Sequence, residues 1–252
     1  MSDIKYSPRA PSSITRTGAF EPFELQAARG QISYHSVVSI FGYQPAVGTS
    51  FIPVWENATA YTPPGSAVVM TLASSNAADT AVTVRINGLD ANYSSITEVV
   101  ALNGTTGVSS VNSYLRINGM TVVTGNPAGN ITAKNGGTTY SQINIGVGRS
   151  QTSIYTVPAG YTFYLQRTQG FTNTVYTTGT YSTYRTSVTN SAGQTGLITV
   201  RPFVSNFTVD RYYPNSYGEK TDIQWQFSSS TGTLAVSFAA EGLLIKNDAG
   251  VA

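Results

Sequence analysis

Short runs of β-branched and aromatic residues recur along the chain from residue 23 onward, and Gly, Asn or Pro separates one run from the next. Residues 81–88 (AVTVRING) show the pattern clearly, because the apolar residues Val82, Val84 and Ile86 alternate with polar ones. This period of two is typical of a half-buried strand, and the Asn-Gly step at its end predicts a tight turn. Comparable runs predict strands at residues 95–104, 114–119, 120–125, 153–165, 197–204, 207–213, 222–227, 233–239 and 242–246. We therefore expect at least ten strands.

Turn residues between neighbouring runs indicate how some strands are joined. Within residues 153–165, Pro158 and Gly160 stand between two β-branched and aromatic runs. Proline presets one turn dihedral and glycine supplies a positive φ, so this segment predicts a hairpin. The Thr- and Tyr-rich stretch 171–184 (FTNTVYTTGTYSTY) has few aliphatic residues for a central core, so we expect an exposed hairpin that contacts a partner or the environment. The last two runs before the C-terminus are expected to be antiparallel neighbours.

Helical composition is confined to residues 24–29 (ELQAAR), which are too few to form a stable helix unaided. Many short strands separated by turn residues are typical of a β-sandwich or a jelly roll. We therefore predict an all-β protein, an antiparallel and jelly-roll-like β-sandwich built as one large or two small sandwich domains. The predicted organisation is an N-terminal arm at 1–22, a β-sandwich part at 23–125 and a second β part at 126–252. The Gly-, Asn- and Thr-rich stretch 124–141 is the candidate junction or long loop, and one domain or two stays open.

The N-terminal arm carries three prolines and several Ser and Thr residues, with no apolar periodicity. It reads either as a frayed terminus or as a segment that orders only on a neighbouring subunit. In the second reading, aromatic and basic side chains supply the contacts. The candidate residues for contact with a capsid or a neighbouring subunit are Tyr6, Arg9, Arg16, Phe20 and Phe23.

Charged residues make up only 10% of the chain, against roughly 25% in average globular domains. Ser, Thr, Asn and Gly fill the surface instead, which suits a protein that is built into an assembly or lives outside a cell. The net charge of +2 is spread without a Lys/Arg block, so we expect no nucleic-acid binding. The N-terminal segment is polar and no apolar run is long enough to span a bilayer, so we expect a soluble protein with no secretory signal and no membrane partner.

Few residues are available for catalytic chemistry. The chain has no cysteine and a single histidine, His35, which leaves few nitrogen or sulfur ligands for a transition metal. No Gly-x-Ser-x-Gly motif presents a nucleophile beside that histidine. Two facing carboxylates would suffice for a glycosidase, and clustered carboxylates would bind Ca²⁺, but sparse acids more often cap turns or pair with Arg and Lys. The acids to consider are Asp90, Glu98, Asp210, Glu219, Asp222 and Glu241. We therefore expect that the protein is not an enzyme and that it binds no metal and no cofactor.

Five segments that span most of the chain are informative together: 23–31 (FELQAARGQ), 84–104 (VRINGLDANYSSITEVVALNG), 155–165 (YTVPAGYTFYL), 200–203 (VRPF) and 241–248 (EGLLIKND). With these segments the chain resembles a family of virion structural proteins of marine and freshwater tailed phages, of the cyanophage type. The resemblance implies a non-enzymatic role on the exterior of the particle, as a cement or decoration protein over the major capsid protein. It also implies a homo-oligomer, for which we expect a trimer. The alternatives are a neck, tail or fibre component that contacts host glycans, and a virion-borne glycan hydrolase.

Overall fold

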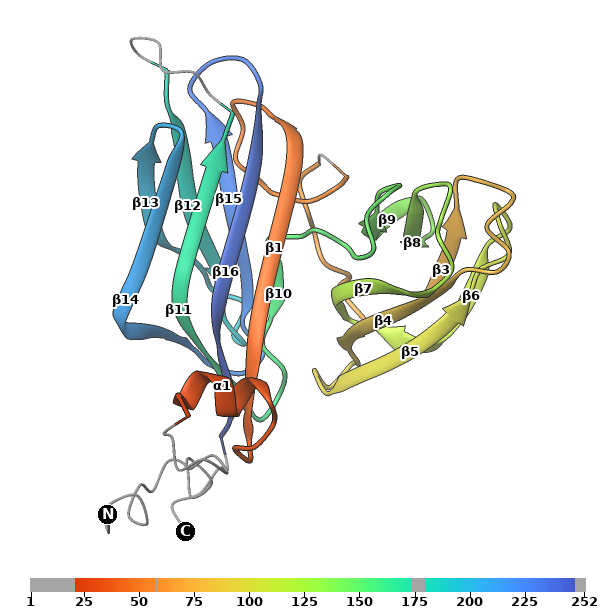
Figure 1. The fold of residues 1–252 in the computed structure, drawn as a ribbon, viewed down its shortest axis with the longest axis horizontal. Helices are drawn as coiled ribbons and strands as arrows, with labels where there is room; N and C mark the ends of the chain where they lie inside the picture. The colour runs from red at the N-terminus through yellow and green to blue at the C-terminus, as the bar shows by residue number, and fades with distance from the viewer. Residues whose placement is uncertain (1–20, 58, 174–179, 248–252) are drawn as a thin grey trace.

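The computed structural model describes residues 21–57, 59–173 and 180–247. Sixteen strands and one short helix make up these residues, and the strands form two groups that lie side by side (Figure 1). We call these groups the large sandwich and the small sandwich. The all-β prediction is confirmed.

The large sandwich consists of two sheets with the strand orders β1-β16-β11-β14 and β10-β15-β12-β13, and the short β2 (Ile52–Pro53) adds to β15. Its eight main strands pair antiparallel in a nested way: the first with the last, the second with the seventh, the third with the sixth and the fourth with the fifth. This nesting defines a jelly roll, which confirms that prediction. The strands are β1 (His35–Val47), β10 (Ile154–Thr156), β11 (Tyr161–Thr172), β12 (Ser182–Thr189), β13 (Thr195–Phe203), β14 (Asn206–Tyr217), β15 (Asp222–Ser229) and β16 (Leu234–Lys246).

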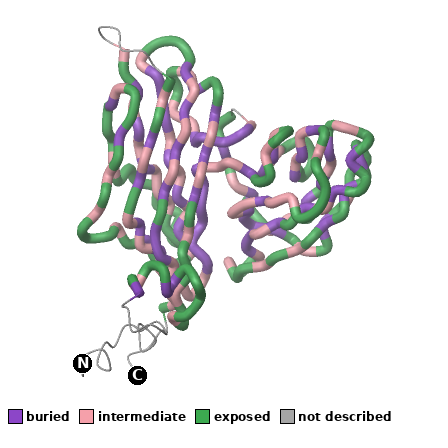
Figure 2. The backbone as a smooth tube through the Cα atoms, in the orientation of Figure 1, coloured by how far each residue is buried: buried purple, intermediate pink, exposed green. Residues whose placement is uncertain are grey.

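Aromatic side chains dominate the core between these two sheets. Tyr184, Trp225, Phe227 and Phe238 are completely buried, and their rings contact one another with centroids 5.3 to 5.9 Å apart. Each lies at a buried position of a strand in which buried and more exposed residues alternate. Buried and exposed residues also alternate along other strands of both sandwiches (Figure 2). Such large apolar surfaces supply most of the driving force for folding.

The small sandwich lies between β2 and β10 in the sequence. Its two sheets have the orders β6-β3-β8-β9 and β5-β4-β7 and share a second core, which includes Met70, Ile86 and Met120. Its strands are β3 (Val68–Ser74), β4 (Thr83–Leu89), β5 (Ser95–Ala101), β6 (Val108–Tyr114), β7 (Arg116–Thr124), β8 (Ile131–Asn135) and β9 (Thr138–Ile143). The chain therefore crosses between the sandwiches twice.

The predicted division into a β-sandwich part at 23–125 and a second β part at 126–252 does not match the two sandwiches, which do not follow one another along the chain. Residues before β3 and residues after β9 both belong to the large sandwich, and the small sandwich is an insertion. The Gly-, Asn- and Thr-rich stretch 124–141 lies inside this insertion, where β8 and most of β9 occupy it.

The predicted turn at Asn87-Gly88 is wrong, because both residues lie inside β4 and pair with β5 and β7. Gly88 is needed there for another reason: a Cβ at this position would collide with the carbonyl oxygen of Arg116 and the ring of Tyr114. The chain turns later, where the Asp90 carboxylate accepts hydrogen bonds from the backbone N–H of Asn92 (2.8 Å) and Ser94 (2.9 Å).

Two predicted hairpins are also wrong. Gly160 has the expected positive φ of 75°, but the turn before it joins β10 to β11, which belong to different sheets. The stretch 171–184 likewise joins β11 to β12 in different sheets, and its Tyr184 lies in the core. In a jelly roll, consecutive strands commonly cross from one sheet to the other. The two runs before the C-terminus are one strand, β16, and not a pair.

Candidate functional site

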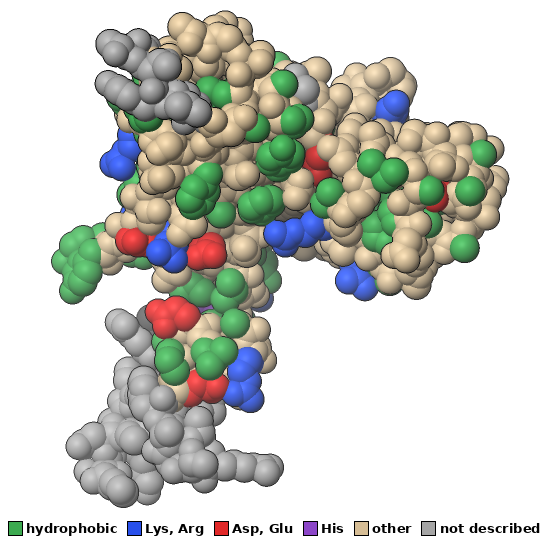
Figure 3. Space-filling model, turned by 45° about the horizontal axis from the view of Figure 1, so that its top comes forward, with side chains coloured by type: hydrophobic (Ala, Val, Ile, Leu, Met, Phe, Trp, Pro, Cys, Tyr) green, Lys and Arg blue, Asp and Glu red, His purple; other side chains and the backbone are tan. Residues whose placement is uncertain are grey.

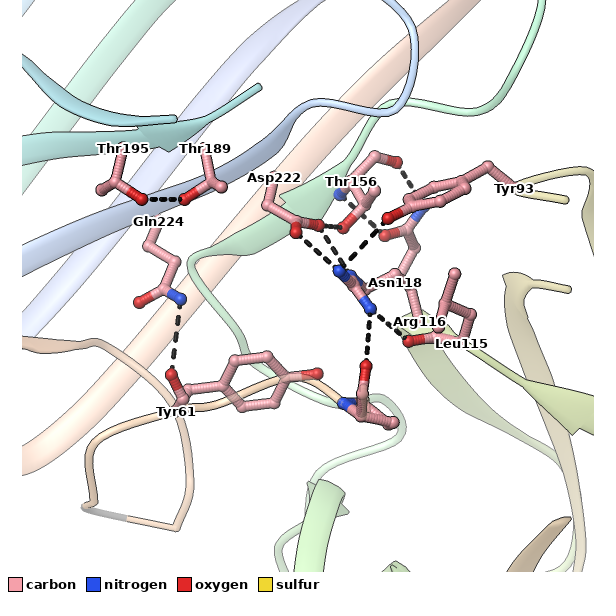
Figure 4. A network of polar contacts seen from close by, with 11 residues as sticks. Tyr61, Tyr93, Leu115, Arg116, Asn118, Thr156, Thr189, Thr195, Asp222 and Gln224 are labelled. Carbon is pink, nitrogen blue, oxygen red and sulfur yellow. Dashed lines mark hydrogen bonds and ion pairs between the residues drawn. The ribbon is translucent and has the colours of Figure 1, made fainter. Parts of the chain in front are cut away.

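A network of polar side chains lies at the joint between the two sandwiches. Arg116, the first residue of β7, reaches Asp222, the first residue of β15, with two parallel hydrogen bonds of 2.7 Å from Nε and Nη2 (Figure 4). Nη1 of Arg116 donates to the carbonyls of Pro64 (3.1 Å) and Leu115 (2.7 Å). Thr156 donates its hydroxyl to Asp222 at 2.5 Å. The guanidinium is thus held in one orientation by both sandwiches.

The electrostatics of this ion pair favour its charged form. Burial alone would lower the pKa of Arg116, but the hydrogen bonds and charge of Asp222 raise it above its ordinary value. The two side chains are only 10% and 17% exposed, so water screens the attraction weakly. A bidentate contact also fixes direction as well as distance. The ion pair therefore connects the small sandwich to the large one at this point.

An apolar cluster forms the second part of the joint. The rings of Trp55 and Tyr61 meet edge to face with centroids 5.3 Å apart, and Ile154 packs with them. The indole of Trp55 donates to the carbonyl of Thr59 at 2.7 Å, while Gln44 of β1 donates to the carbonyl of Trp55 at 2.6 Å. Burial raises the pKa of Tyr61, so its hydroxyl stays neutral. The chain crosses from the large to the small sandwich through residues 54–67 and returns through residues 144–153. These contacts hold the first of the two crossing segments on the large sandwich.

Glu56 connects the two crossing segments. Its buried carboxyl accepts a hydrogen bond from the backbone N–H of Gln151 on the returning segment. Its second oxygen, Oε2, has no hydrogen-bond partner among the described residues. Burial raises the pKa of Glu56 to about 8, although the backbone hydrogen bonds oppose the shift. The carboxyl is consequently protonated at neutral pH.

The acids considered for hydrolysis hold the fold together. Asp222 is taken up by Arg116 and Thr156, and Asp210 pairs with Arg167 at 2.8 Å. The other three acids with hydrogen bonds accept them from backbone N–H groups: Asp90 from Asn92 and Ser94, Glu98 from Val111 and Asn112, and Glu219 from Gly160. Glu241 lies opposite Arg167 in the ladder between β11 and β16. Asp90, Asp210 and Asp222 thus have the turn and ion-pair roles that the sequence analysis favoured.

His35 has a local structural role. Its Nδ1 lies 2.8 Å from the carbonyl oxygen of Ser33, and its ring meets Phe23 edge to face at 5.6 Å. Among the described residues, no group of three or more His, Asp or Glu side chains is placed to hold a metal ion. No helix within the described part of the chain is long and apolar enough to cross a membrane.

Of the predicted contact residues, the structure places Phe23; Tyr6, Arg9, Arg16 and Phe20 lie outside the described residues. Phe23 begins helix α1 (Phe23–Ala28), which lies at one end of the large sandwich (Figure 1). It is half-buried against His35, so part of its ring serves a contact within the chain. Contact of these five residues with a partner stays a prediction.

The sequence analysis missed an exposed apolar edge of the large sandwich. Three aliphatic side chains of β13 and two tyrosines of β14 are exposed there, on the side away from the small sandwich (Figure 1). The residues are Leu197, Ile198, Val200, Tyr212 and Tyr213. Both segments were predicted as strands, but sequence alone did not reveal that they are edge strands.

No protein-family model matches the chain, and no curated protein matches it significantly. Among solved structures, T=1 particles derived from infectious bursal virus align over 85% of this chain and 70% of theirs, with 11% identity and a TM-score of 0.24. The VP2 subviral particle of infectious bursal disease virus aligns over 86% and 73%, with 11% identity and a TM-score of 0.23. These scores are too low to support an argument about function.

Proposed function

We propose that this chain is a structural protein of a tailed-phage virion, a cement or decoration protein on the exterior of the capsid. The observation that carries the proposal is the joint, where the bidentate Arg116–Asp222 pair connects the small sandwich to the jelly roll. A protein with two connected sandwiches can bind a lattice through one and project the other. The jelly roll of the large sandwich also occurs in viral capsid proteins, which supports the proposal by analogy.

The surface composition also supports a role in an assembly. Charged side chains are scattered over the face shown in Figure 3, and uncharged polar surface dominates it. With so few charges, electrostatic self-repulsion is weak and close packing of many copies costs little. The proposed partner is the major capsid protein, and many simultaneous contacts would stabilise the shell by mass action. The homotrimer stays a prediction of the resemblance.

Binding to capsids tests the proposal directly. The purified full chain is added to particles that lack it and sedimented with them. We expect saturable co-sedimentation at a fixed ratio to the major capsid protein, together with a higher temperature of DNA release. A variant that lacks the N-terminal arm, residues 1–22, is expected to bind more weakly, because the arm is proposed to lie on neighbouring subunits. Full-length protein that neither co-sediments nor stabilises the particles would overturn the decoration role.

The second candidate function is a neck, tail or fibre component that binds host glycans. The aromatic side chains at the two sides of residues 174–179 favour it, because Phe171 and Tyr181 are 49% and 45% exposed. Exposed aromatic rings stack on sugar rings, and the neighbouring Thr and Ser hydroxyls would add hydrogen bonds. Binding of the purified chain to host surface glycans, lost in Phe171→Ala together with Tyr181→Ala, would favour this function over the first.

A further inference from the structure

Strand β13 has one free side. Its nine residues pair with β12, and no other described strand pairs with it. The N–H and C=O groups on the opposite side are therefore available to another strand. Eight of the nine residues are exposed or half-exposed, which is unusual for a strand of a packed sandwich.

The first six residues of β13, 195–200, carry no side chain that blocks pairing. Natural edge strands are protected by Lys, by other charges or by Pro, which make edge-to-edge contact unfavourable. Residues 195–200 contain none of these, and Leu197, Ile198 and Val200 are 53 to 58% exposed. A register shift against β12 at Ile198 makes this residue a bulge, which turns neighbouring apolar side chains outward together. Arg201 and Pro202, near the end of the strand, are the two residues of β13 that are of this protecting kind.

The opposite edges of the large sandwich are covered. Beside β1, a Cβ on Gly42 would collide with Val54 and Ser153 of the crossing segments. Strand β10 is itself in contact with β7 of the small sandwich. Among the described strands of the large sandwich, the edge formed by β13 and β14 is thus the open one, and a head-to-tail contact between two large sandwiches would find no matching free edge.

We propose that two copies of this chain associate through β13, with the two β13 strands antiparallel about a twofold axis near Ile198 and Thr199. In this arrangement Val200 of each copy lies beside Leu197 of the other, which gives two apolar cross-strand pairs. Arg201 of each copy lies opposite Gly196, so the two cations stay apart. A twofold contact uses the same surface on both copies and closes the free edge of both. The proposal does not rest on the virion role.

The exposed area is adequate for such a contact. Tyr212 and Tyr213 are 90% and 82% exposed on neighbouring β14, where their rings meet edge to face with centroids 4.9 Å apart. Strands β13 and β14 run antiparallel from a shared turn, so these rings lie at about the height of Leu197 and Ile198 along the sandwich. Together the five side chains offer on the order of 600 Å² of apolar surface per copy, against about 800 Å² per partner in a standard interface.

Sedimentation of the full chain tests the association. We expect a dimer at tens of micromolar, and Ile198→Lys should weaken self-association at least about tenfold, because the lysine places two like charges at the axis. Val111→Lys is the matched control: Val111 is 89% exposed on β6 of the small sandwich, and its substitution should leave the dimer unchanged. A monomer at these concentrations, the trimer that the resemblance implies in place of a dimer, or a dimer that Ile198→Lys leaves intact would each overturn the proposal.

A disulfide trap tests the register independently of stability. The chain has no cysteine, so a single introduced thiol reports only on its own symmetry mate. Ile198→Cys and Thr199→Cys should form covalent dimers under mild oxidation, because residues near the axis face their counterparts. Val111→Cys should remain monomeric on a non-reducing gel. Equal cross-linking of all three variants would show that chance collision, and not β13 pairing, produces the dimer.

Discussion

Arg116 and Asp222 are 106 positions apart in the chain, and two hydrogen bonds of 2.7 Å join them across the two sandwiches. Each residue is the first of its strand, so the pair links the start of β7 to the start of β15. Because the guanidinium also donates to two backbone carbonyls, it cannot turn away from Asp222 without losing several hydrogen bonds at once.

Asp222→Ala should destabilise the protein by about 3 kcal/mol, since it leaves the Arg116 charge buried without its partner. The crossing segments, residues 54–67 and 144–153, should also become sensitive to limited proteolysis. Chemical denaturation and protease mapping would measure both effects.

The control for Asp222→Ala is Asp210→Ala, which breaks the Arg167–Asp210 pair. Its side chains are 44% and 69% exposed, so we expect a loss below about 1 kcal/mol and no new cleavage. Equal losses in the two variants would contradict a special role for the joint.

Glu56 should make stability depend on pH. The carboxyl is protonated in both folded and unfolded chains below pH 4.5, its ordinary pKa, and its burial then costs least. Between this value and the folded pKa of about 8, only the unfolded chain releases the proton, so the free energy of unfolding falls by up to about 1.4 kcal/mol per pH unit.

Glu56→Gln should remove this contribution, because the amide resembles the protonated carboxyl and its oxygen still accepts from Gln151. Urea titrations at several pH values between 5 and 8 would show a stability gap between variant and wild type that widens as the pH rises. A gap that stays constant would show that Glu56 is ionised in the fold.

Gly88→Ala should destabilise the small sandwich by about 2 kcal/mol, because its Cβ has no room beside Arg116 and Tyr114. Gly65→Ala is the control, since nothing lies within 4 Å of a Cβ at that position. Thermal unfolding of both variants gives their midpoint temperatures, and we expect the lower midpoint for Gly88→Ala. Equal midpoints would mean that the strands separate easily at Gly88.

Local patterns predicted the strands well and the turns less well. The same Asn-Gly step lies inside β4 at Asn87-Gly88 and in a turn at Asn103-Gly104, where Gly104 has a φ of 58°. The dipeptide permits a turn, but close approach of a neighbouring strand equally requires glycine. Only the tertiary structure distinguishes the two cases.

The joint and the open edge could not be predicted from the sequence, because both depend on distant pairing. His35 lies opposite Ile245 in the nested ladder, and no local pattern indicates that partner. Tyr184 was predicted in an exposed hairpin because the stretch has few aliphatic residues, but aromatic rings fill much of this core in their place. The exposure of Leu197 follows from the position of β13 at the end of its sheet, and its composition alone suggests a buried strand.

The copy number of this chain in purified virions tests the proposed structural role most directly. Quantitative mass spectrometry against the major capsid protein provides the ratio. The decoration role predicts hundreds of copies per particle. A few to dozens would favour the neck, tail or fibre alternative, and absence of the chain from the particles would contradict a virion role altogether.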